Sequence, residues 1–561
     1  MPQTDFILLR ISDTYDFHKL PFLHVPQNEP RNSHAAGMPF IDLFAVVSRL
    51  EKAGYRERVI DLPYRMARSK RFDVESSIKK LEAPVFAIGM NETVQVRDAL
   101  EVARLIKKYR PESRTIFYGC AAIHFHLGLI NYPDVDCVMR GNFDGTSAAQ
   151  FMQAAVVGRF SKIPGLVWKE KSGRVRQNEL SADFASPNLN VTEYYTSVAG
   201  QILRYRAFDS AALLKRWLHH PEISIFKTGC AASPLFVSQE TSGELPAFRA
   251  PEDVYRDIAE LCRFSPAPVS IKGDIRMPGE NYGERLLSLL QHRPVANQLV
   301  LELGDAAPAF FIQEIARASP GFRLNIAPGS HDESVRKMLG HTYSNRDLES
   351  TIESALRAKV QSVEILFLIG LPGQTAESVI ETTIYCEYLL RRFDGDRRLS
   401  LSIAPCSLPC SSPLLESPES YGFKPRFRTF EQRLDALALP GWKDRLEYQT
   451  AEMSTEQIAA ATYGSLIFLV RLKAKYGQLP YRKSEEIVAN YARGIEMSYR
   501  LDEIIKNGRT DELASLKPEI DRINDYAAGS HQNLSLPLMM MRPQNLLALG
   551  KAMAESNPWR R

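Results

Sequence analysis

The chain has 561 residues, of which 44% are hydrophobic and 24% charged, and its formal net charge is +4. These values are typical of a globular protein with two or three domains, and the near-neutral balance gives no indication of nucleic-acid binding. We find no apolar run of about 18 residues and no secretory signal pattern, so no membrane span is expected. The seven widely spaced cysteines predict reduced thiols in a cytoplasmic protein rather than a disulfide framework.

Residues 1–156 alternate short apolar runs with helical patterns. Strands are predicted at 5–11, 58–62, 84–90, 114–119 and 135–141. This alternation predicts an α/β domain with a parallel, doubly wound (Rossmann-like) sheet. Ligands of such sheets bind beyond the carboxyl ends of the strands. The candidate ligand-binding loops are therefore 11–17, 90–93, 119–122 and 141–145.

Residues 157–220 predict a hairpin that turns at Ser172 and Gly173, followed by a connector. Residues 221–430 then contain six further strand patterns separated by helices, at 223–229, 268–274, 298–304, 322–330, 363–373 and 399–406. Six such units predict a partial (β/α)6 barrel of the TIM type, with its chemistry at the carboxyl ends of the strands. Residues 431–561 predict a C-terminal helical domain.

Several stretches along this order match one known family. They are 15–17, 48–62, 68–75, 101–112, 135–142, 273–285, 330–337 and 369–375. With them, the chain resembles the cobalamin-binding radical SAM family (B12-binding domain/radical SAM domain proteins) from about residue 5 to about residue 480. The resemblance implies an N-terminal B12-binding-type domain followed by a radical-SAM barrel.

In that family the first barrel strand ends in a C-x3-C-x2-C motif. Its thiolates hold three irons of a [4Fe–4S] cluster, and the fourth iron binds S-adenosylmethionine (SAM). Here the first position is Cys230, but the next two are Pro234 and Val237. Neither side chain can bind iron, so we expect the conventional cluster to be absent and the motif to be degenerate.

Other positions that contact SAM in the family also differ. The second strand ends in Lys272-Gly273-Asp274 instead of a Gly-Gly-Glu-like turn, and Gly329 stands where a glutamate is typical. Gly370 and Gly373 would allow a close approach of the adenine, or they serve only a tight turn of the barrel. The candidate SAM contacts are Asp274, Gly370 and Gly373, and the departures weaken the expectation of SAM binding. The charged group around Asp274 is either a set of ligand contacts or a salt-bridged loop.

The D-x-H-x-x-G motif that supplies a cobalt-binding histidine is missing, as it is in the resembled family. The resemblance places the corrin against the loops of the first sheet, where Gly119-Cys120-Ala121 replaces a Gly-Gly-x-His-like turn. The predicted contacts are Tyr15, Met90, Asn91, Glu92, Thr93, Gly119, Cys120, Ala121, Gly141 and Asn142. The alternative is a doubly wound domain that has lost its ligand.

Cys406 and Cys410 follow the sixth barrel strand, whereas Cys230 follows the first. All three thiols are therefore expected at the same mouth of the barrel, where chemistry collects. We hypothesise that they form a relocated metal or redox site; the alternative is a set of ordinary buried thiols. His331, Asp332 and Glu333 predict the cap of a helix.

Three functions are open. The first is a B12-dependent enzyme that uses non-radical methyl transfer, or other organometallic or redox chemistry, on a small-molecule substrate. The second is a pseudoenzyme that binds or scaffolds for a catalytic protein partner. The third is a radical SAM methyltransferase whose cluster is held unusually. We favour the first, and no residue selects the substrate.

Overall fold

The structure is a computed structural model that describes residues 4–26, 40–141, 143–170, 172–180, 190–206, 208–227, 247–410 and 412–528. The first sheet has seven strands in the order β2-β1-β3-β4-β5-β6-β7. They are β1 (Phe6–Arg10), β2 (Glu57–Asp61), β3 (Val85–Gly89), β4 (Arg114–Tyr118), β5 (Cys137–Met139), β6 (Leu166–Lys169) and β7 (Val175–Gln177). The first five are parallel. Their order is that of a doubly wound sheet whose direction of winding reverses between β1 and β3.

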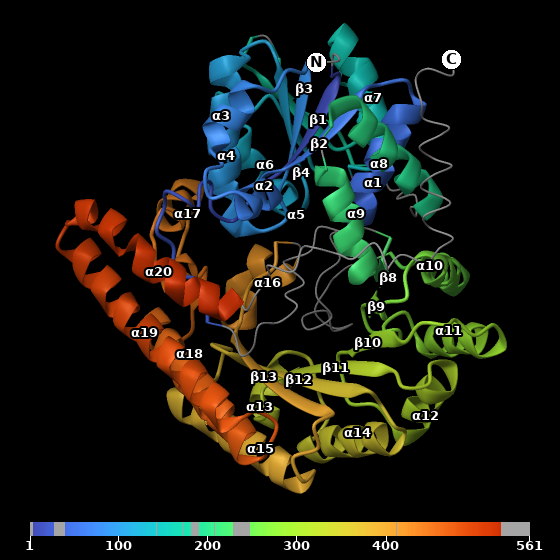
Figure 1. The fold of residues 1–561 in the computed structure, drawn as a ribbon, viewed down its shortest axis with the longest axis vertical. Coiled ribbons are helices and arrows are strands. Elements are labelled where there is room, and N and C mark those ends of the chain that lie inside the picture. Colours follow the sequence, from blue (N-terminus) through green and yellow to red (C-terminus); the bar gives the residue numbers. More distant parts are fainter. Residues whose placement is uncertain are drawn as a thin grey trace.

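Helices cover both faces of this sheet, as the continuous burial of β3 requires. Figure 1 shows α1 (Phe40–Lys52) and α7 (Gly145–Val157) on one side and α3 (Val74–Lys79) and α4 (Val96–Tyr109) on the other. Helix α4 buries an apolar stripe at helical spacing that includes Val96, Ala99, Val102, Ala103 and Ile106. Two short helices follow strand ends, α2 (Leu62–Arg68) and α5 (Cys120–His124), and α6 (His126–Leu129) follows α5.

The predicted hairpin is confirmed. Strands β6 and β7 pair antiparallel, and Gly173 turns between them with a positive φ of 83°. The hairpin continues the first sheet, because β6 also pairs with β5. It is therefore part of that sheet rather than of a separate connector. Helices α8 (Val191–Tyr205) and α9 (Asp209–His219) then lead to the second sheet.

The second sheet has six parallel strands in sequential order, β13-β12-β11-β10-β9-β8. The strands are β8 (Glu222–Ser224), β9 (Val269–Lys272), β10 (Leu299–Leu303), β11 (Arg323–Gly329), β12 (Ser362–Ile369) and β13 (Leu399–Pro405). The helices between them lie along the outer side of the sheet (Figure 1): α10 (Pro251–Phe264), α11 (Glu280–His292), α12 (Ala309–Ala318), α13 (Glu333–Met338), α14 (Asn345–Arg357) and α15 (Ala376–Arg392). This sequential βα order is the one predicted from the six strand patterns.

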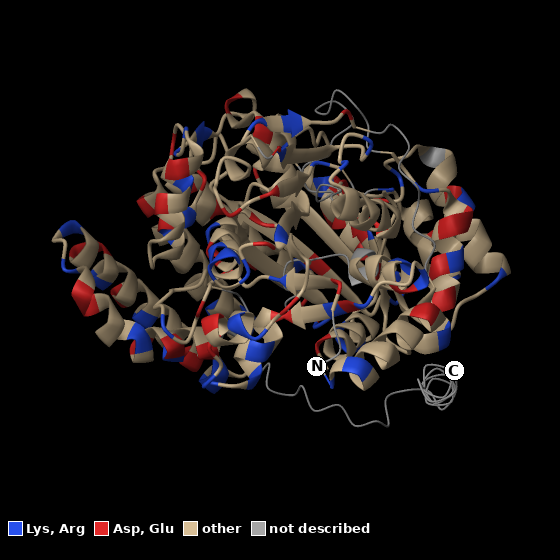
Figure 2. Ribbon diagram, turned by 90° about the horizontal axis from the view of Figure 1, so that it is seen from above, with Lys and Arg blue, Asp and Glu red and all other residues tan. Residues whose placement is uncertain are grey.

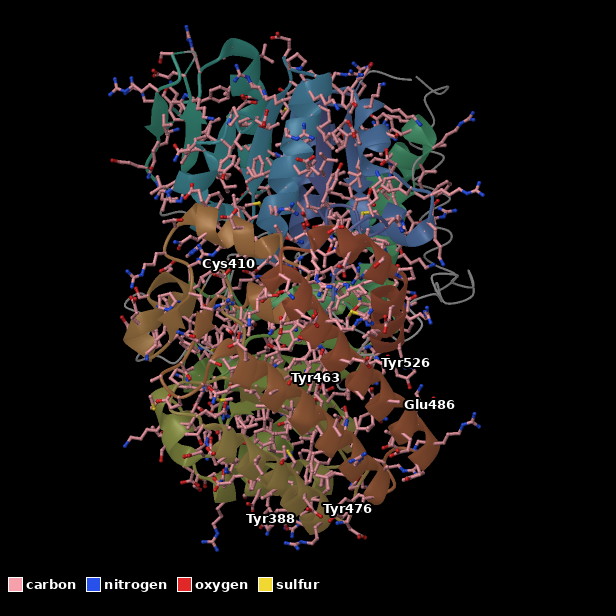
Figure 3. The ribbon with its side chains drawn as sticks, turned by 90° about the vertical axis from the view of Figure 1, so that its left-hand side faces the viewer. Tyr388, Cys410, Tyr463, Tyr476, Glu486 and Tyr526 are labelled. Carbon is pink, nitrogen blue, oxygen red and sulfur yellow. The ribbon has the colours of Figure 1, made fainter. Side chains whose placement is uncertain are left out.

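The C-terminal part is mainly helical, as predicted. It begins with α16 (Pro413–Glu416), η3 (Pro418–Tyr421), β14 (Lys424–Pro425), α17 (Phe430–Leu437), η4 (Trp442–Arg445) and β15 (Tyr448–Gln449). The long helices α18 (Thr455–Lys475) and α19 (Tyr481–Lys506) follow, then η5 (Thr510–Glu512) and α20 (Leu513–Ala528). Tyr463, Leu466, Ile487 and Ile520 form a separate core between α18, α19 and α20, and Figure 3 shows Tyr463 and Tyr526 within this helical layer.

Two further properties concern the surface. Basic and acidic residues are interspersed along the outer helices (Figure 2). Among the described helices, none combines the length and the apolar character that crossing a bilayer requires.

Candidate functional site

The loops that follow β3 and β4 meet at the carboxyl edge of the first sheet. The Met90 N–H donates to the carbonyl of Tyr118 at 2.9 Å, and the Met90 carbonyl accepts from Ala121 N at 3.3 Å. The side-chain oxygen of Asn91 accepts from Cys120 N at 3.1 Å. The structure thus brings together the two predicted loops 90–93 and 119–121. They lie beside the point between β1 and β3 where ligands of doubly wound sheets bind.

Gly119 is needed by this contact between loops. Its φ is +102°, and an added Cβ would lie 2.3 Å from the Met90 carbonyl oxygen. The space on that side of Gly119 is therefore filled by protein, and Ala121 is fully buried. Cys120 is disulfide-bonded, so the expectation of reduced thiols throughout is wrong there. The other described cysteines are free: Cys137, Cys262, Cys386, Cys406 and Cys410.

Glu92 places an ionisable group at the same edge. Its carboxylate caps η1 (Thr93–Gln95), whose Gln95 side chain accepts from the backbone N–H of Asn91 at 2.8 Å. Burial, reinforced by the negative charge of Asp13 and opposed by Arg10, raises the pKa of Glu92 to about 7. A carboxyl with this pKa can hold or release a proton near neutral pH.

Thr93 and Cys410 join the edge of the first sheet to the end of the second. The Thr93 hydroxyl and the Cys410 thiol, which follows β13, lie 3.2 Å apart and are both buried. Figure 3 shows Cys410 at the boundary between the two parts of the molecule. Burial raises the pKa of Cys406 and of Cys410 to about 12, so both are protonated thiols at neutral pH.

The three-thiol site stays a prediction, because Cys230, like Pro234 and Val237, lies outside the described residues. Within the described ranges, no group of three or more His, Cys, Asp or Glu side chains is arranged to hold a metal ion. Cys406 Sγ contacts the carbonyl oxygen of Ser407 at 3.7 Å.

The remaining predicted cobalamin contacts lie on other loops. Tyr15 lines a groove of about 620 Å³ together with residues of α4 and α17, including Asp98 and Leu434. Gly141 follows β5, and an added Cβ there would make ordinary van der Waals contacts with Leu180 at 3.9 Å and with the Pro164 carbonyl oxygen at 4.0 Å. Asn142 lies outside the described residues.

The inner face of the second sheet carries a polar row that the sequence analysis missed. Its members stand at alternating positions on neighbouring strands: Lys272, Glu302, Asn325, Glu364 and Ser402. Lys272 Nζ lies 2.8 Å from Glu302 Oε1, and the Ser402 hydroxyl donates to Glu364 Oε1 at 3.0 Å. The alternation of polar and aliphatic residues within each strand was the signal that could have revealed this face.

Lys272 is held as a cation by its neighbours. Burial works to lower its pKa, but the carboxylates of Glu302 and Glu222 outweigh burial and raise it. Glu302 is also occupied through its second oxygen, which accepts from Gly273 N at 3.2 Å. The pair therefore belongs to the folded sheet itself.

The predicted SAM contact Asp274 is also occupied by protein groups. Its carboxylate accepts from Arg276 Nη2 at 2.6 Å and from Gly304 N at 3.0 Å. Arg276 in turn donates to the carbonyl oxygens of Asp305 and Ala306. This arrangement supports the salt-bridged loop, which ties the end of β9 to the end of β10.

Gly370 and Gly373 form a tight turn after β12. Both have positive φ, and an added Cβ at Gly370 would lie 2.9 Å from the Tyr448 hydroxyl. An added Cβ at Gly373 would lie 3.1 Å from the sulfur of Met338. Gln374 completes the turn by accepting from Gly370 N at 2.8 Å. The turn packs against the protein on both sides, which favours the structural alternative for these glycines.

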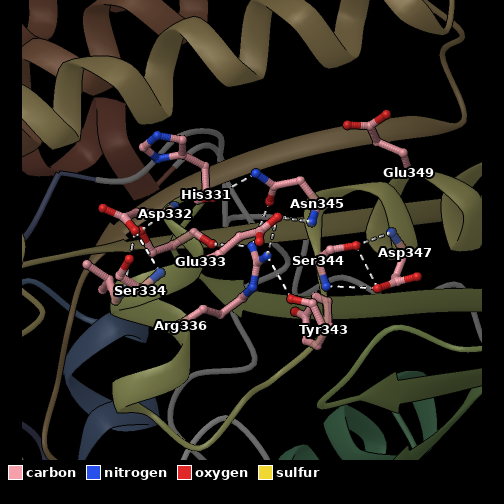
Figure 4. A network of polar contacts seen from close by, with 12 residues as sticks. His331, Asp332, Glu333, Ser334, Arg336, Tyr343, Ser344, Asn345, Asp347 and Glu349 are labelled. Atoms are coloured by element: carbon pink, nitrogen blue, oxygen red, sulfur yellow. Dashed lines mark hydrogen bonds and ion pairs between the residues drawn. The ribbon is translucent and has the colours of Figure 1, made fainter.

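The helix cap predicted after β11 is confirmed. Asp332 accepts from Ser334 N at 2.8 Å and begins α13. Figure 4 shows the larger network around it, centred on Arg336, which is 0% exposed. Arg336 donates to the Ser330 carbonyl at 2.9 Å and to Asn345 Oδ1 at 2.8 Å. Sequence reasoning missed Arg336, since an arginine on a short polar helix gives no signal of burial.

The class of fold follows from comparison with solved structures. No family model and no curated protein matches the sequence. The fold is that of cobalamin-dependent radical SAM enzymes. TsrM from Kitasatospora setae, solved with cobalamin and a [4Fe–4S] cluster, is 14% identical, with 87% of this chain and 99% of that chain covered and a TM-score of 0.53. OxsB, solved with aqua-cobalamin and SAM, is 11% identical, with 99% of this chain and 84% of that chain covered and a TM-score of 0.51.

Proposed function

We propose that this chain binds cobalamin where the carboxyl edges of its two sheets meet, and that it is a B12-dependent enzyme without radical chemistry. One observation carries the proposal. The junction closed by Thr93 and Cys410 lies within a fold shared along 99% of the chain with OxsB, whose structure contains aqua-cobalamin. We assign residues 1–156 to cobalamin binding, 221–430 to the barrel and 431–561 to the helical domain.

The residues present fit a large cofactor of low charge. The loops after β3 and β4 offer Asn91 and Glu92 as partly exposed groups, and Gly141 presents only backbone at the end of β5. When bound, cobalamin supplies a cobalt that accepts and donates methyl groups. Asn91 would keep the two loops in register, and Glu92 would hold or release a proton at its carboxylate.

Several observations support chemistry without radicals. Pro234 and Val237 remove two of the three thiolates that a cubane cluster requires. The buried thiols Cys406 and Cys410 are protonated at neutral pH. Asp274 already pairs with Arg276. The reaction is therefore methyl transfer, or other organometallic or redox chemistry, on a small molecule, with SAM or another methyl donor.

Binding of hydroxocobalamin to the full chain, followed by its corrin absorption, tests the first half of the proposal. We expect one molecule per chain in the wild type. Gly141→Phe should weaken binding about ten-fold or more, because it adds an aromatic ring to the loop after β5, one of the proposed contact loops. Val157→Phe, at an exposed site on α7, is the matched control and should bind normally. A wild-type chain that binds no corrinoid would overturn the proposal.

Iron analysis of anaerobically purified protein tests the second half. We expect no stoichiometric iron, because the thiolate set is incomplete. About four irons per chain would show a cluster held in an unusual way and would restore radical chemistry.

A scaffolding role is the second candidate, and the self-paired second sheet favours it. Asp274, Lys272 and Glu302 bond to other protein groups, which leaves fewer side chains to act on a substrate. This role would be supported by a chain that binds cobalamin and transfers no methyl group alone. Methyl transfer would then begin only when a protein partner is added.

A further inference from the structure

A groove of about 500 Å³ at the edge of the first sheet lies among residues that the proposed function does not use. It is formed by β2, α2, α3 and the turns that follow the two helices. Four cationic side chains line it, namely Arg58, Arg65, Arg71 and Lys80, against the single carboxylate of Asp73. Basic and acidic residues are interspersed along the chain (Figure 2), so this excess of cations is local.

Two of these lining charges are already neutralised. Arg65 makes a two-pronged pair with Asp209, with Nε to Oδ1 at 2.8 Å and Nη2 to Oδ2 at 2.6 Å. Asp73 receives Lys19 Nζ at 2.5 Å and accepts from Ser76 N at 2.8 Å, where it caps α3. Asp73 is therefore not available to compensate the other cations of the groove.

Arg58, Arg71 and Lys80 form no ion pair with any carboxylate of the described residues. Arg58 is the most confined of the three. Its Nε is buried without a hydrogen-bond partner, and its guanidinium lies 5.3 Å from the centre of the Tyr205 ring. Burial and the neighbouring Arg65 guanidinium lower the pKa of Arg58, against the opposing charge of Asp209, which is itself paired with Arg65. Because a desolvated charge is costly without a counter-ion, the groove is short of an anion.

We propose that this groove binds a small phosphate monoester. Its phosphate is held by Arg58, Arg71 and Lys80, and its organic part packs on Phe72. Guanidinium groups match the geometry of phosphate oxygens through paired N–H donors. The volume of the groove falls within the range of about 300–1,000 Å³ that is usual for small-ligand sites.

Calorimetric titration of the full chain in a phosphate-free, low-salt buffer tests the proposal, with adenosine 5′-monophosphate, inorganic phosphate and adenosine as probes. We expect saturable binding of the monophosphate at one site, weaker binding of phosphate and none of adenosine. Arg58→Met keeps the aliphatic stem and should weaken monophosphate binding about ten-fold. Arg71→Glu, on an exposed turn, should do the same and guards against misfolding of the first variant.

Arg471→Met is the control, because Arg471 is exposed on α18 and forms no ion pair with the described residues. This variant should bind adenosine 5′-monophosphate as tightly as the wild type does. Absence of saturable monophosphate binding, or unchanged binding in both Arg58→Met and Arg71→Glu, would overturn the site. Phosphate that binds as tightly as the monophosphate would overturn the claim of an ester. None of these outcomes depends on cobalamin.

Discussion

The loops after β3 and β4 of the first sheet are held by other contacts than the loop after β9 of the second sheet. In the first sheet, the loops after β3 and β4 are held together by backbone groups and one amide, at Met90, Asn91 and Ala121. In the second, the corresponding positions carry charged side chains that pair with one another, as Asp274 does with Arg276. A ligand at the second edge would have to compete with these charged pairs, whereas at the loops after β3 and β4 it would meet backbone and amide hydrogen bonds.

This difference bears on how the chain departs from its structural neighbours. A large cofactor of low net charge needs small residues more than counter-charges, and the loops of the first sheet carry Gly119, Ala121 and Gly141. An amino acid-like ligand needs free charges, and those at the second edge are engaged. The proposed loss of SAM contacts with retention of a corrinoid site rests on this difference between the two edges.

The largest effect is expected for Gly119→Ala. The new Cβ would lie 2.3 Å from the Met90 carbonyl oxygen at a φ of +102°, so the two loops must separate. We expect a loss of about 2–4 kcal/mol in the free energy of unfolding, measured with urea. In Gly141→Ala the new Cβ makes only ordinary van der Waals contacts, the nearest at 3.9 Å, and stability should change by less than about 0.5 kcal/mol. Equal losses in both variants would show that the contact between loops does not hold this edge.

Lys272→Met tests whether the charges of the second sheet are internal to it. The variant leaves Glu302 without its cation at 2.8 Å, and we expect a loss of about 1–3 kcal/mol. Adding Glu302→Gln should recover part of that loss, with a coupling energy of about 1 kcal/mol in urea denaturation. Strictly additive losses in the two single variants would mean that Lys272 and Glu302 do not stabilise each other and are available to a ligand.

Much of the fold could be predicted from periodicity. Alternating strands and helices identified both parallel sheets, and the Ser172-Gly173 turn identified the β6–β7 hairpin. The pattern could not show that β6 pairs with β5, because the antiparallel pairing at the edge of a sheet depends on contacts between residues distant in sequence. Strand β8 ends at Ser224, whereas its apolar pattern continued beyond that residue.

The candidate site was predictable only at the level of loops. The carboxyl ends of strands indicated 90–93 and 119–122, since parallel strands end at a common edge. What the glycines face was not predictable: Gly370 packs against Tyr448 from a distant segment. The same holds for Arg336, whose burial depends on the fold of the loop that carries Tyr343 and Asn345.

Glu92 gives the first edge a pH dependence. Burial raises its pKa from 4.5 to about 7 in the folded protein, so the folded state binds its proton more tightly than the unfolded state does. The resulting stabilisation is complete below about pH 4.5 and is lost as the pH rises through about 7. The urea midpoint of the wild type should fall as the pH rises from about 4.5 to about 7. In Glu92→Gln the fall in the free energy of unfolding over this range should be smaller by about 1–2 kcal/mol. The exposed Glu496→Gln should leave the slope unchanged.

The smallest expected effect concerns the contact that joins the two edges. Thr93 Oγ1 and Cys410 Sγ lie 3.2 Å apart in a buried setting. Thr93→Val and Cys410→Ala each remove one partner, and a double-mutant cycle should give a coupling energy of about 0.5–1 kcal/mol. The matched cycle of Thr93→Val with Cys386→Ala, a buried free thiol on α15, should be additive. A coupling energy near zero in the first cycle would mean that the hydrogen bond between Thr93 and Cys410 does not hold the two edges together. A ligand between the edges would then not have to break this bond.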